Sequence, residues 1–170
     1  SISRLKQFHE LNNSWLIGYL GYDIKNEIHE LESKNNDRAE MPDMYFFEPE
    51  ILVRINGNTI SVKAENPDDV FDTILKTRPI EVNKLPQLEF KKRMTKEEYV
   101  GNAEKIRQHI IEGDVYEMSY CQEFYCDEAE INTQNLYLRL CTEFPNPFSC
   151  FMKIYDKYII SSSMERFMKK

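Results

Sequence analysis

The sequence lacks the features of membrane proteins and of disordered chains. Glycine occurs 5 times and tryptophan once, and the 41% of hydrophobic and 30% of charged residues are usual for a globular protein. No apolar run approaches the roughly 20 residues that a membrane-spanning helix requires. The first residues, with Arg4, Lys6 and His9 among polar neighbours, do not form the apolar region of a signal peptide. We therefore expect a cytoplasmic protein that has no membrane partner.

Positive charge is also scarce. The chain has 22 Lys and Arg residues against 29 Asp and Glu residues, and its net charge is -7. Proteins that bind nucleic acids take most of their affinity from clustered Lys and Arg side chains. The composition therefore argues against DNA or RNA as a partner.

Cysteine is present without a metal-binding pattern. Cys121, Cys126, Cys141 and Cys150 form no Cys-x-x-Cys pair and have no histidine cluster nearby in the sequence, so a zinc site is not indicated. Cys121 and Cys150 lie in apolar, strand-like runs where a small hydrophobic residue would fit. We expect buried thiols in a reducing compartment.

The first third of the chain predicts strands around a short helix. The apolar run 15–20 favours a buried strand, and residues 24–31 fit a helix. A hairpin is expected at 51–62, because the Asn-Gly-Asn sequence at 56–58 supplies the positive φ that a tight turn requires.

Two further helices have recognisable start signals. Pro67 suits the first helical position after an Asn66 cap. Thr95 and Glu98 have the spacing of a capping box, and Gly113 can end that helix in the left-handed conformation. The second helix is expected to bury an apolar face formed by Tyr99, Ala103, Ile106 and Ile110.

The last third predicts a strand, a helix and a hairpin. Residues 115–124 alternate as a strand does, residues 132–143 fit a helix, and strands at 149–155 and 158–162 are expected to turn at 156–157. Strands and helices mix without a regular βαβ rhythm. We therefore expect an α+β fold of antiparallel sheets with surrounding helices, in a single domain.

Three segments follow one another at regular intervals. Residues 113–124 contain Gly-Asp-Val-Tyr-Glu-Met-Ser and then Gln-Glu-Phe, residues 146–151 read Asn-Pro-Phe-Ser-Cys-Phe, and residues 163–168 read Ser-Met-Glu-Arg-Phe-Met. In this order they resemble motifs of the chorismate-utilising enzymes, and within them of the component I subunits of aminodeoxychorismate (para-aminobenzoate) synthases. Two departures stand out, Ser119 where asparagine is usual and Met164 where proline is usual.

The resemblance implies a larger protein than these 170 residues. Residues 1–170 are expected to form one part, in the N-terminal portion, of a fold with two packed sheets like that of anthranilate synthase component I. The segment expected beyond them holds a Pro-Ile-Lys-Gly-Thr lysine, which forms a covalent intermediate, and the glutamates that bind Mg²⁺. The resemblance thus implies Mg²⁺ as a cofactor with ligands outside this chain, an inactive chain on its own, and a glutamine amidotransferase partner that supplies ammonia.

Glu165 is the candidate catalytic residue. A Glu-Arg pair at the end of a strand is by itself typical of a solvated surface ion pair. The family motif implies instead that Glu165 is the general acid for the departing hydroxyl of chorismate. Such a hydroxyl is a poor leaving group unless it is protonated, and a carboxyl group whose pKa is raised by burial can protonate it. Met164 leaves the backbone before Glu165 freer than a proline would.

Pro147, Phe148 and Ser149 are candidate ligand-binding residues. They match a segment that lines a tryptophan pocket in relatives, and the other half of that pocket is expected from residues before Ser1. The alternative is that Pro147 and Phe148 start a strand and pack into the core.

The resemblance implies the conversion of chorismate and ammonia to 4-amino-4-deoxychorismate, a step of folate biosynthesis. Two alternatives remain open. The first is anthranilate synthase component I, although the Pro-Phe-Ser-Cys-Phe sequence at 147–151 differs from the Pro-Ser-Pro-Tyr-Met typical of that enzyme. The second is a binding module without catalysis, which senses tryptophan or docks the amidotransferase.

Overall fold

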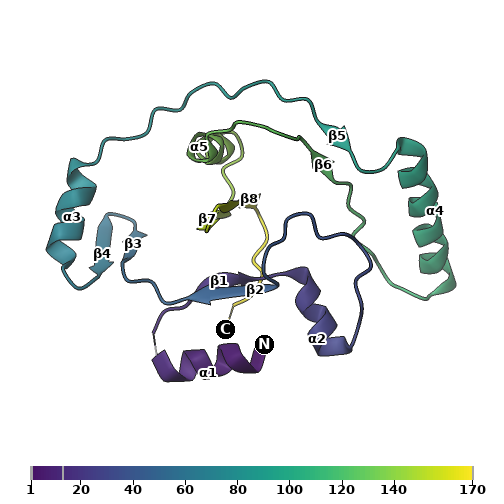
Figure 1. The fold of residues 1–170 in the computed structure, drawn as a ribbon, viewed down its shortest axis with the longest axis horizontal. Coiled ribbons are helices and arrows are strands. Elements are labelled where there is room, and N and C mark those ends of the chain that lie inside the picture. The colour runs from purple at the N-terminus through teal and green to yellow at the C-terminus, as the bar shows by residue number, and fades with distance from the viewer. Residues whose placement is uncertain (1, 13, 170) are drawn as a thin grey trace. The chain divides into compact units, whose positions relative to one another are not determined.

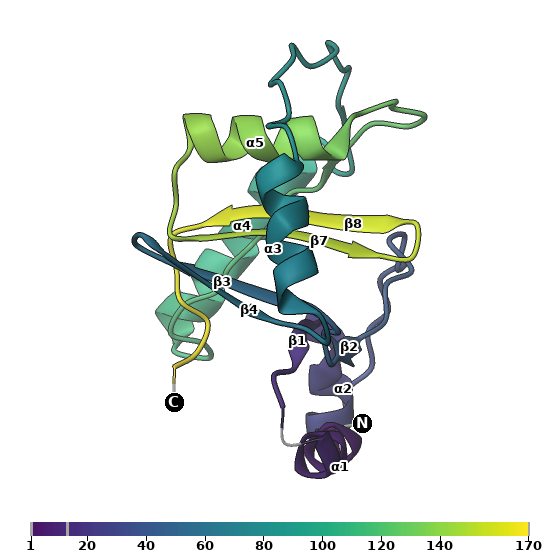
Figure 2. The ribbon, with the colours of Figure 1, turned by 90° about the vertical axis from the view of Figure 1, so that its left-hand side faces the viewer.

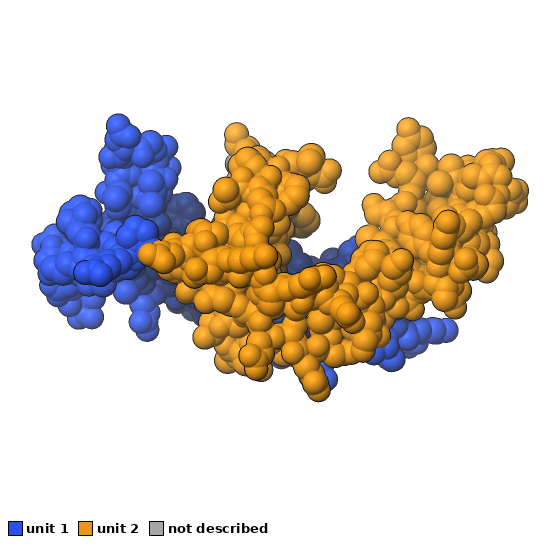
Figure 3. All heavy atoms as spheres, turned by 90° about the horizontal axis from the view of Figure 1, so that it is seen from above, with its two compact units in different colours: residues 1–79 blue, residues 80–170 orange. Residues whose placement is uncertain are grey.

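The computed structural model describes residues 2–12 and 14–169. The chain divides into two compact units, residues 1–79 and residues 80–170 (Figure 3). Within the described residues, helices accompany four two-stranded antiparallel sheets, two in each unit (Figure 1). The α+β class is therefore confirmed.

Unit 1 alternates helices with short strands. In chain order its elements are α1 (Ile2–Asn12), β1 (Ile17–Leu20), the 3-10 helix η1 (Tyr22–Ile24), α2 (Lys25–His29), β2 (Met44–Phe47), β3 (Leu52–Asn56), β4 (Thr59–Lys63) and α3 (Pro67–Lys76).

The β1–β2 pair depends on a glycine. Gly18 lies opposite Phe46, and a Cβ atom at Gly18 would stand 1.9 Å from the carbonyl oxygen of Tyr45. Any other residue would push the two strands apart. The strand predicted at 15–20 is confirmed at Ile17–Leu20, but it is half-buried rather than buried, and Trp15 is 60% exposed.

The β3–β4 hairpin is confirmed, since Asn56 pairs with Thr59 and Gly57 takes a φ of 56° in the loop between them. The helix predicted after it is also present. Pro67 occupies its first turn and Asn66 is the N-cap residue as predicted, but the Asn66 side chain makes no capping hydrogen bond. The proline itself starts the helix, because its fixed φ suits the first helical position.

Unit 2 holds the longest helix and the two longest strands of the described residues, together with two very short strands. Its elements are β5 (Lys91–Lys92), α4 (Lys96–Glu112), β6 (Phe124–Tyr125), α5 (Thr133–Glu143), β7 (Phe148–Ile154) and β8 (Lys157–Ser163).

Helix α4 begins and ends as predicted. The backbone N–H of Glu98 donates to Thr95 Oγ1 at 3.1 Å, and the backbone N–H of Thr95 donates to Glu98 Oε2 at 2.7 Å. Gly113 closes the helix with a φ of 84°. Its apolar face is not buried, however, because Ile106 is half-buried and Ile110 is 39% exposed.

The strand predicted at 115–124 is wrong over most of its length. Only Phe124 and Tyr125 form a ladder, with Lys92 and Lys91, and the N–H of Arg93 extends it by donating to Glu123 O at 3.1 Å. Alternating side chains make a strand possible, but a strand is held by hydrogen bonds to a neighbour. Among the described residues, 115–122 have no such neighbour.

Helix α5 lies along the β7–β8 hairpin (Figure 2). The ring of Tyr137 lies 5.4 Å from that of Phe151, centroid to centroid, and Ile154 on the same hairpin is only 3% exposed. The helix and hairpin predictions for 132–143 and 149–162 are therefore confirmed. The turn falls at 155–156 rather than 156–157, because Ile154 pairs with Lys157.

A buried amide joins α5 to the segment before β5. Asn135 is 5% exposed, and its side chain accepts from Asn83 N at 2.8 Å and donates to Asn83 O at 2.7 Å. Both polar ends of the buried amide are thus satisfied by one backbone residue.

The expectation of buried cysteines fails in part. All four thiols are free, but Cys121 is exposed and the other three are half-buried. Cys121 lies in the segment 115–122, which pairs with no strand within the described residues. The Cys141 thiol hydrogen-bonds the Tyr137 hydroxyl, and this contact, followed by burial, raises the pKa of that phenol.

Candidate functional site

The open end of the β7–β8 hairpin brings the two predicted site segments together. Phe148 lies directly opposite Ser163, and Ser149 lies opposite Ser162. The residues before β7 therefore meet the residues after β8, although they are far apart in the sequence. We call residues 144–149 and 162–166 the hairpin-end site.

Serine and asparagine side chains tie this end of the hairpin together. Ser149 Oγ donates to Asn146 O at 2.8 Å, Ser162 Oγ donates to Phe144 O at 2.7 Å, and Asn146 Nδ2 donates to Ser162 O at 3.2 Å. The two hydroxyl oxygens of Ser149 and Ser162 are 3.3 Å apart. These bonds fix the backbone of both segments at the point where the strands end.

Glu165 lies on the loop that follows β8. Its backbone N–H donates to Ser163 Oγ at 3.1 Å, and its side chain is exposed, as is that of Met164. The burial expected around a general acid is therefore not provided by the described residues. Its catalytic role stays a prediction.

Arg166 lies over an aromatic ring of the opposite segment. Its Cζ atom is 5.1 Å from the centroid of the Phe148 ring, within the range of a cation–π contact. Phe148 is the first residue of β7, so the strand start expected in the alternative is present, but Phe148 is only half-buried and Pro147 is exposed, so the two residues do not pack into a core. The Phe148–Arg166 contact was not predicted from the sequence, because nothing in either motif indicates that the two residues are neighbours.

A second polar cluster joins α4 to residues 120–122. Asn102 Nδ2 donates to Tyr120 Oη at 2.8 Å, the rings of Tyr99 and Tyr120 stack 4.9 Å apart, and Gln122 Nε2 donates to Met94 O at 3.0 Å. Glu117 and Ser119 nearby do not belong to a strand. This cluster replaces the sheet contacts predicted for the segment.

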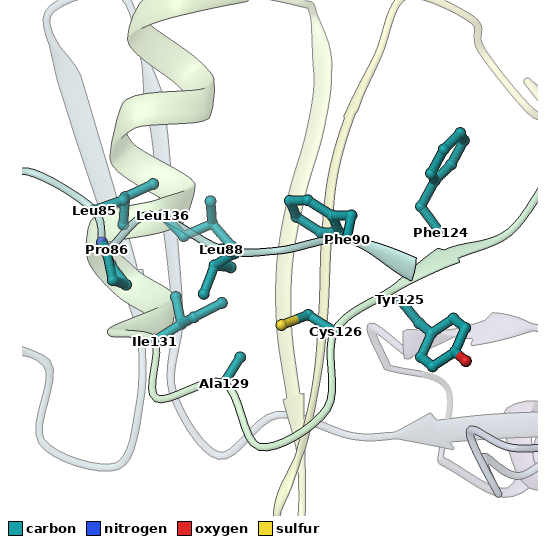
Figure 4. A pocket seen from close by; sticks show the side chains of 10 residues that line it. All are labelled: Leu85, Pro86, Leu88, Phe90, Phe124, Tyr125, Cys126, Ala129, Ile131 and Leu136. Atoms are coloured by element: carbon teal, nitrogen blue, oxygen red, sulfur yellow. The ribbon is translucent and has the colours of Figure 1, made fainter. Parts of the chain in front are cut away.

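The described residues also enclose an apolar cavity of about 410 Å³ in unit 2. Figure 4 shows the side chains that line it: Leu85, Pro86, Leu88, Phe90, Phe124, Tyr125, Cys126, Ala129, Ile131 and Leu136. Phe90 is 61% and Phe124 55% exposed. The lining has no carboxylate, imidazole or amine, and its titratable groups are the Tyr125 phenol and the Cys126 thiol, so the cavity offers mainly apolar contact.

One group of side chains has metal-ligand chemistry among the described residues. His109, Glu112 and Asp114 offer ligand atoms within 4.8 Å of one another, and all three are exposed. His109 Nδ1 lies 2.7 Å from Asp114 Oδ2. Glu165 is not part of this group.

None of the helices among residues 2–12 and 14–169 combines the length and the apolar character needed to cross a membrane.

Comparison with known protein families decides the family. The model of the family described as "chorismate binding enzyme" matches residues 2–170. The chain belongs to the chorismate binding enzyme family. The resemblance drawn from the three motifs is thereby confirmed at the level of the family.

Members of two functional classes are similar to this chorismate binding chain. "Anthranilate synthase component 1" of Acetivibrio thermocellus is 26% identical over 92% of the chain, which covers 37% of that protein. "Aminodeoxychorismate synthase component 1" of Escherichia coli (strain K12) is 24% identical over 89% of the chain, which covers 34% of that protein. The chain thus spans little more than a third of the length of these relatives.

A solved structure has the same fold over most of the chain. The crystal structure of anthranilate synthase component I from Streptococcus pneumoniae TIGR4 superimposes with a TM-score of 0.73 at 25% identity. The superposition covers 88% of this chain and 38% of the other. The predicted fold of the anthranilate synthase component I type is therefore confirmed.

Proposed function

We propose that this chain is part of a component I subunit that aminates chorismate to 4-amino-4-deoxychorismate, as an aminodeoxychorismate synthase does. The observation that carries the proposal is the meeting of two family-like motifs at one place. Phe148 pairs with Ser163 and Ser149 with Ser162 in the last two rungs of the β7–β8 hairpin, and Glu165 lies on the loop beyond them. The family match over residues 2–170 supports the substrate class.

Glu165 is the general acid in this proposal. The allylic C–O bond of chorismate breaks, the oxygen takes the proton of the Glu165 carboxyl group and leaves as water, and an amine forms the new bond to the ring and gives up a proton, which restores the Glu165 carboxyl group. A carboxylic acid suits this step because it removes the need to expel hydroxide. Its place on an exposed loop allows a substrate to reach it.

Pro147, Phe148 and Ser149 form a ligand-binding segment in this proposal, of the kind that holds a tryptophan-type molecule. An aromatic ring and a hydroxyl group suit a ligand with an aromatic body and polar ends. Phe148 and Ser149 are both half-buried, so part of each side chain stays accessible.

Mg²⁺ and a glutamine amidotransferase belong to the proposal for the longer subunit. Mg²⁺ requires several oxygen ligands in octahedral geometry. Among the described residues, the three grouped metal-capable side chains are those of His109, Glu112 and Asp114, which do not include Glu165. The hairpin-end site therefore does not supply a Mg²⁺ ligand set, and no step is assigned to the metal. The amidotransferase would supply the ammonia.

Anthranilate synthase component I is the second candidate function. Relatives from Acetivibrio thermocellus and Lactococcus lactis carry that name at 26% and 27% identity. The sequence Pro-Phe-Ser-Cys-Phe at 147–151 favours the first candidate, because anthranilate synthases typically have Pro-Ser-Pro-Tyr-Met there.

Product analysis separates the two candidates. The full-length subunit is incubated with chorismate, an ammonium salt and Mg²⁺, and the products are separated by chromatography. We expect 4-amino-4-deoxychorismate, which a separately added lyase converts to para-aminobenzoate. Anthranilate, identified by its fluorescence, would establish the second candidate. Chorismate left intact would contradict both enzymes and favour a binding module, which titration calorimetry with tryptophan then tests.

A further inference from the structure

We propose that Ser163 and Phe148 are positioning residues that hold the Glu165 loop at both of its ends. This inference rests on the proposed function, since it concerns the residue to which that function assigns the proton transfer. In this role, neither Ser163 nor Phe148 touches the substrate. Each acts through the backbone or the side chain next to Glu165.

Ser163 holds the side of the loop that precedes Glu165. It is the last residue of β8, so the pairing with Phe148 fixes its backbone. Its Oγ atom accepts from Glu165 N at 3.1 Å and lies 3.4 Å from Glu165 O. A serine hydroxyl that bonds the backbone two residues on stabilises a turn. The Glu165 backbone is thereby tied to the end of the sheet.

Phe148 holds the side of the loop that follows Glu165. Its ring lies under the Arg166 guanidinium group, with 5.1 Å between Cζ and the ring centroid. Phe148 is itself half-buried and paired with Ser163. Both neighbours of the segment 164–165 are thus attached to the same rung of the hairpin.

The methionine at position 164 leaves the backbone before Glu165 in need of another restraint. A proline at this position would fix φ near -65° immediately before the acid, and methionine does not. Methionine at 164 is also 72% exposed, so packing does not restrain it. The hydroxyl of Ser163 supplies a restraint that a proline ring would supply covalently. Displacement of a catalytic group by about 1 Å can lower a rate about 100-fold.

The first test compares variants of the full-length subunit in the chorismate and ammonium assay. We expect Ser163→Ala to lower kcat by about 10-fold, with the KM for chorismate little changed, because a loosened acid is less often in place. Ser163→Thr keeps the hydroxyl group and should retain activity. Ser161→Ala, two positions earlier on the same strand, is the matched control and should leave kcat unchanged.

A double variant tests the comparison with proline. Proline at 164 requires an extended residue before it, and Ser163 is extended because it lies in β8. Adding Met164→Pro to Ser163→Ala should therefore recover most of the lost kcat. Unchanged kcat in Ser163→Ala, or a loss that neither threonine nor the added proline restores, would overturn the role of Ser163.

The second test does not depend on catalysis. In the full-length protein labelled selectively at arginine, the Cδ protons of Arg166 should be shifted upfield by the ring current of Phe148. Phe148→Leu should remove that shift and also lower kcat, whereas Phe148→Tyr should preserve both. An Arg166 signal that is the same in Phe148→Leu as in the natural protein would overturn the role of Phe148.

Failure of the positioning inference can be distinguished from failure of the proposed function. If Glu165→Gln keeps normal turnover, the proton-transfer role of Glu165 is wrong, whatever the Arg166 signal shows. If Glu165→Gln is inactive while Ser163→Ala and Phe148→Leu are fully active, the acid is right and the positioning inference is wrong.

Discussion

Helix α4 and the β7–β8 hairpin are stabilised in opposite ways. Both ends of helix α4 are fixed by local contacts, the reciprocal Thr95–Glu98 bonds at one end and Gly113 at the other, and Tyr99 and Asn102 join the helix to Tyr120 by a ring stack and a hydrogen bond. None of its residues is buried. The hairpin is held by partners distant in the sequence, since α5 packs on it and Ile154 is buried at 3% exposure. Substitutions within α4 should therefore have little effect on the structure outside that helix. Substitutions around the hairpin should change the structure of the hairpin-end site.

The largest expected effect is on catalysis at the hairpin end. Glu165→Gln keeps the size and the hydrogen bonding of the side chain but cannot donate a proton. In the full-length subunit we expect kcat to fall by on the order of 10² to 10⁴, with little change in chorismate affinity. Arg166→Gln should have a much smaller effect. Steady-state kinetics at saturating chorismate measure both, and near-normal turnover in Glu165→Gln would remove this residue from the mechanism.

The next effect compares a buried isoleucine with an exposed one. Ile154→Ala should lower the free energy of unfolding by about 2 to 5 kcal/mol, because it leaves a cavity in a packed site. Ile110→Ala on α4 is the matched control, and it should lower that free energy by about 1 kcal/mol, since Ile110 is 39% exposed. Urea denaturation gives both values. Equal losses would mean that α4 buries its apolar face after all.

Asn135 tests a polar contact that supports α5. Asn135→Ala removes both hydrogen bonds between the buried amide and the backbone of Asn83, so we expect a loss of about 1 to 3 kcal/mol in the free energy of unfolding, at about 0.5 to 1.5 kcal/mol for each bond. Gln134→Ala, the exposed neighbour on the same helix, should change little. If the two variants unfold at the same denaturant concentration, the Asn83 contact contributes nothing measurable.

A substitution at the N-terminal cap of α4 should cause the smallest loss in the stability of the protein. Thr95→Ala removes the side-chain cap, and a loss of about 1 kcal/mol is expected. Thr95→Ser keeps the hydroxyl and should be close to neutral. Thermal denaturation followed by circular dichroism distinguishes the two, and identical midpoints for alanine and serine would show that the cap is not used.

The same cap has a pH dependence. Hydrogen bonds from Thr95, the backbone bond first, lower the pKa of Glu98. A carboxyl group whose pKa is lower in the folded state stabilises the fold fully above its unfolded pKa of about 4.3, and this contribution is lost as the pH falls through the lower, folded pKa. An NMR titration should find the pKa of Glu98 below that of an exposed glutamate. In Thr95→Ala, which removes the side-chain bond but keeps the backbone N–H, it should rise only part of the way toward the ordinary value.

Some features of the fold had signals in the sequence that were not used. Helix α1 has apolar residues at Ile2, Leu5 and Phe8, which lie within about 120° of one another around the helix axis. The short strand β2 is an apolar run, Met44–Phe47, that the prediction passed over. In contrast, no sequence signal could show that residues 115–122 lack a ladder partner, because alternation describes the strand and not its neighbour.

The sequence by itself determined the features that depend on neighbours three or four residues away. The capping box of α4, the Gly57 turn and the proline start of α3 all belong to this group, since their hydrogen bonds and dihedral angles are local. Only the tertiary structure decided that Phe148 lies under Arg166 and that Asn135 holds Asn83. The two residues of each pair are far apart in the chain, and they meet because a hairpin of two seven-residue strands and the helix packed on it bring distant backbone segments together.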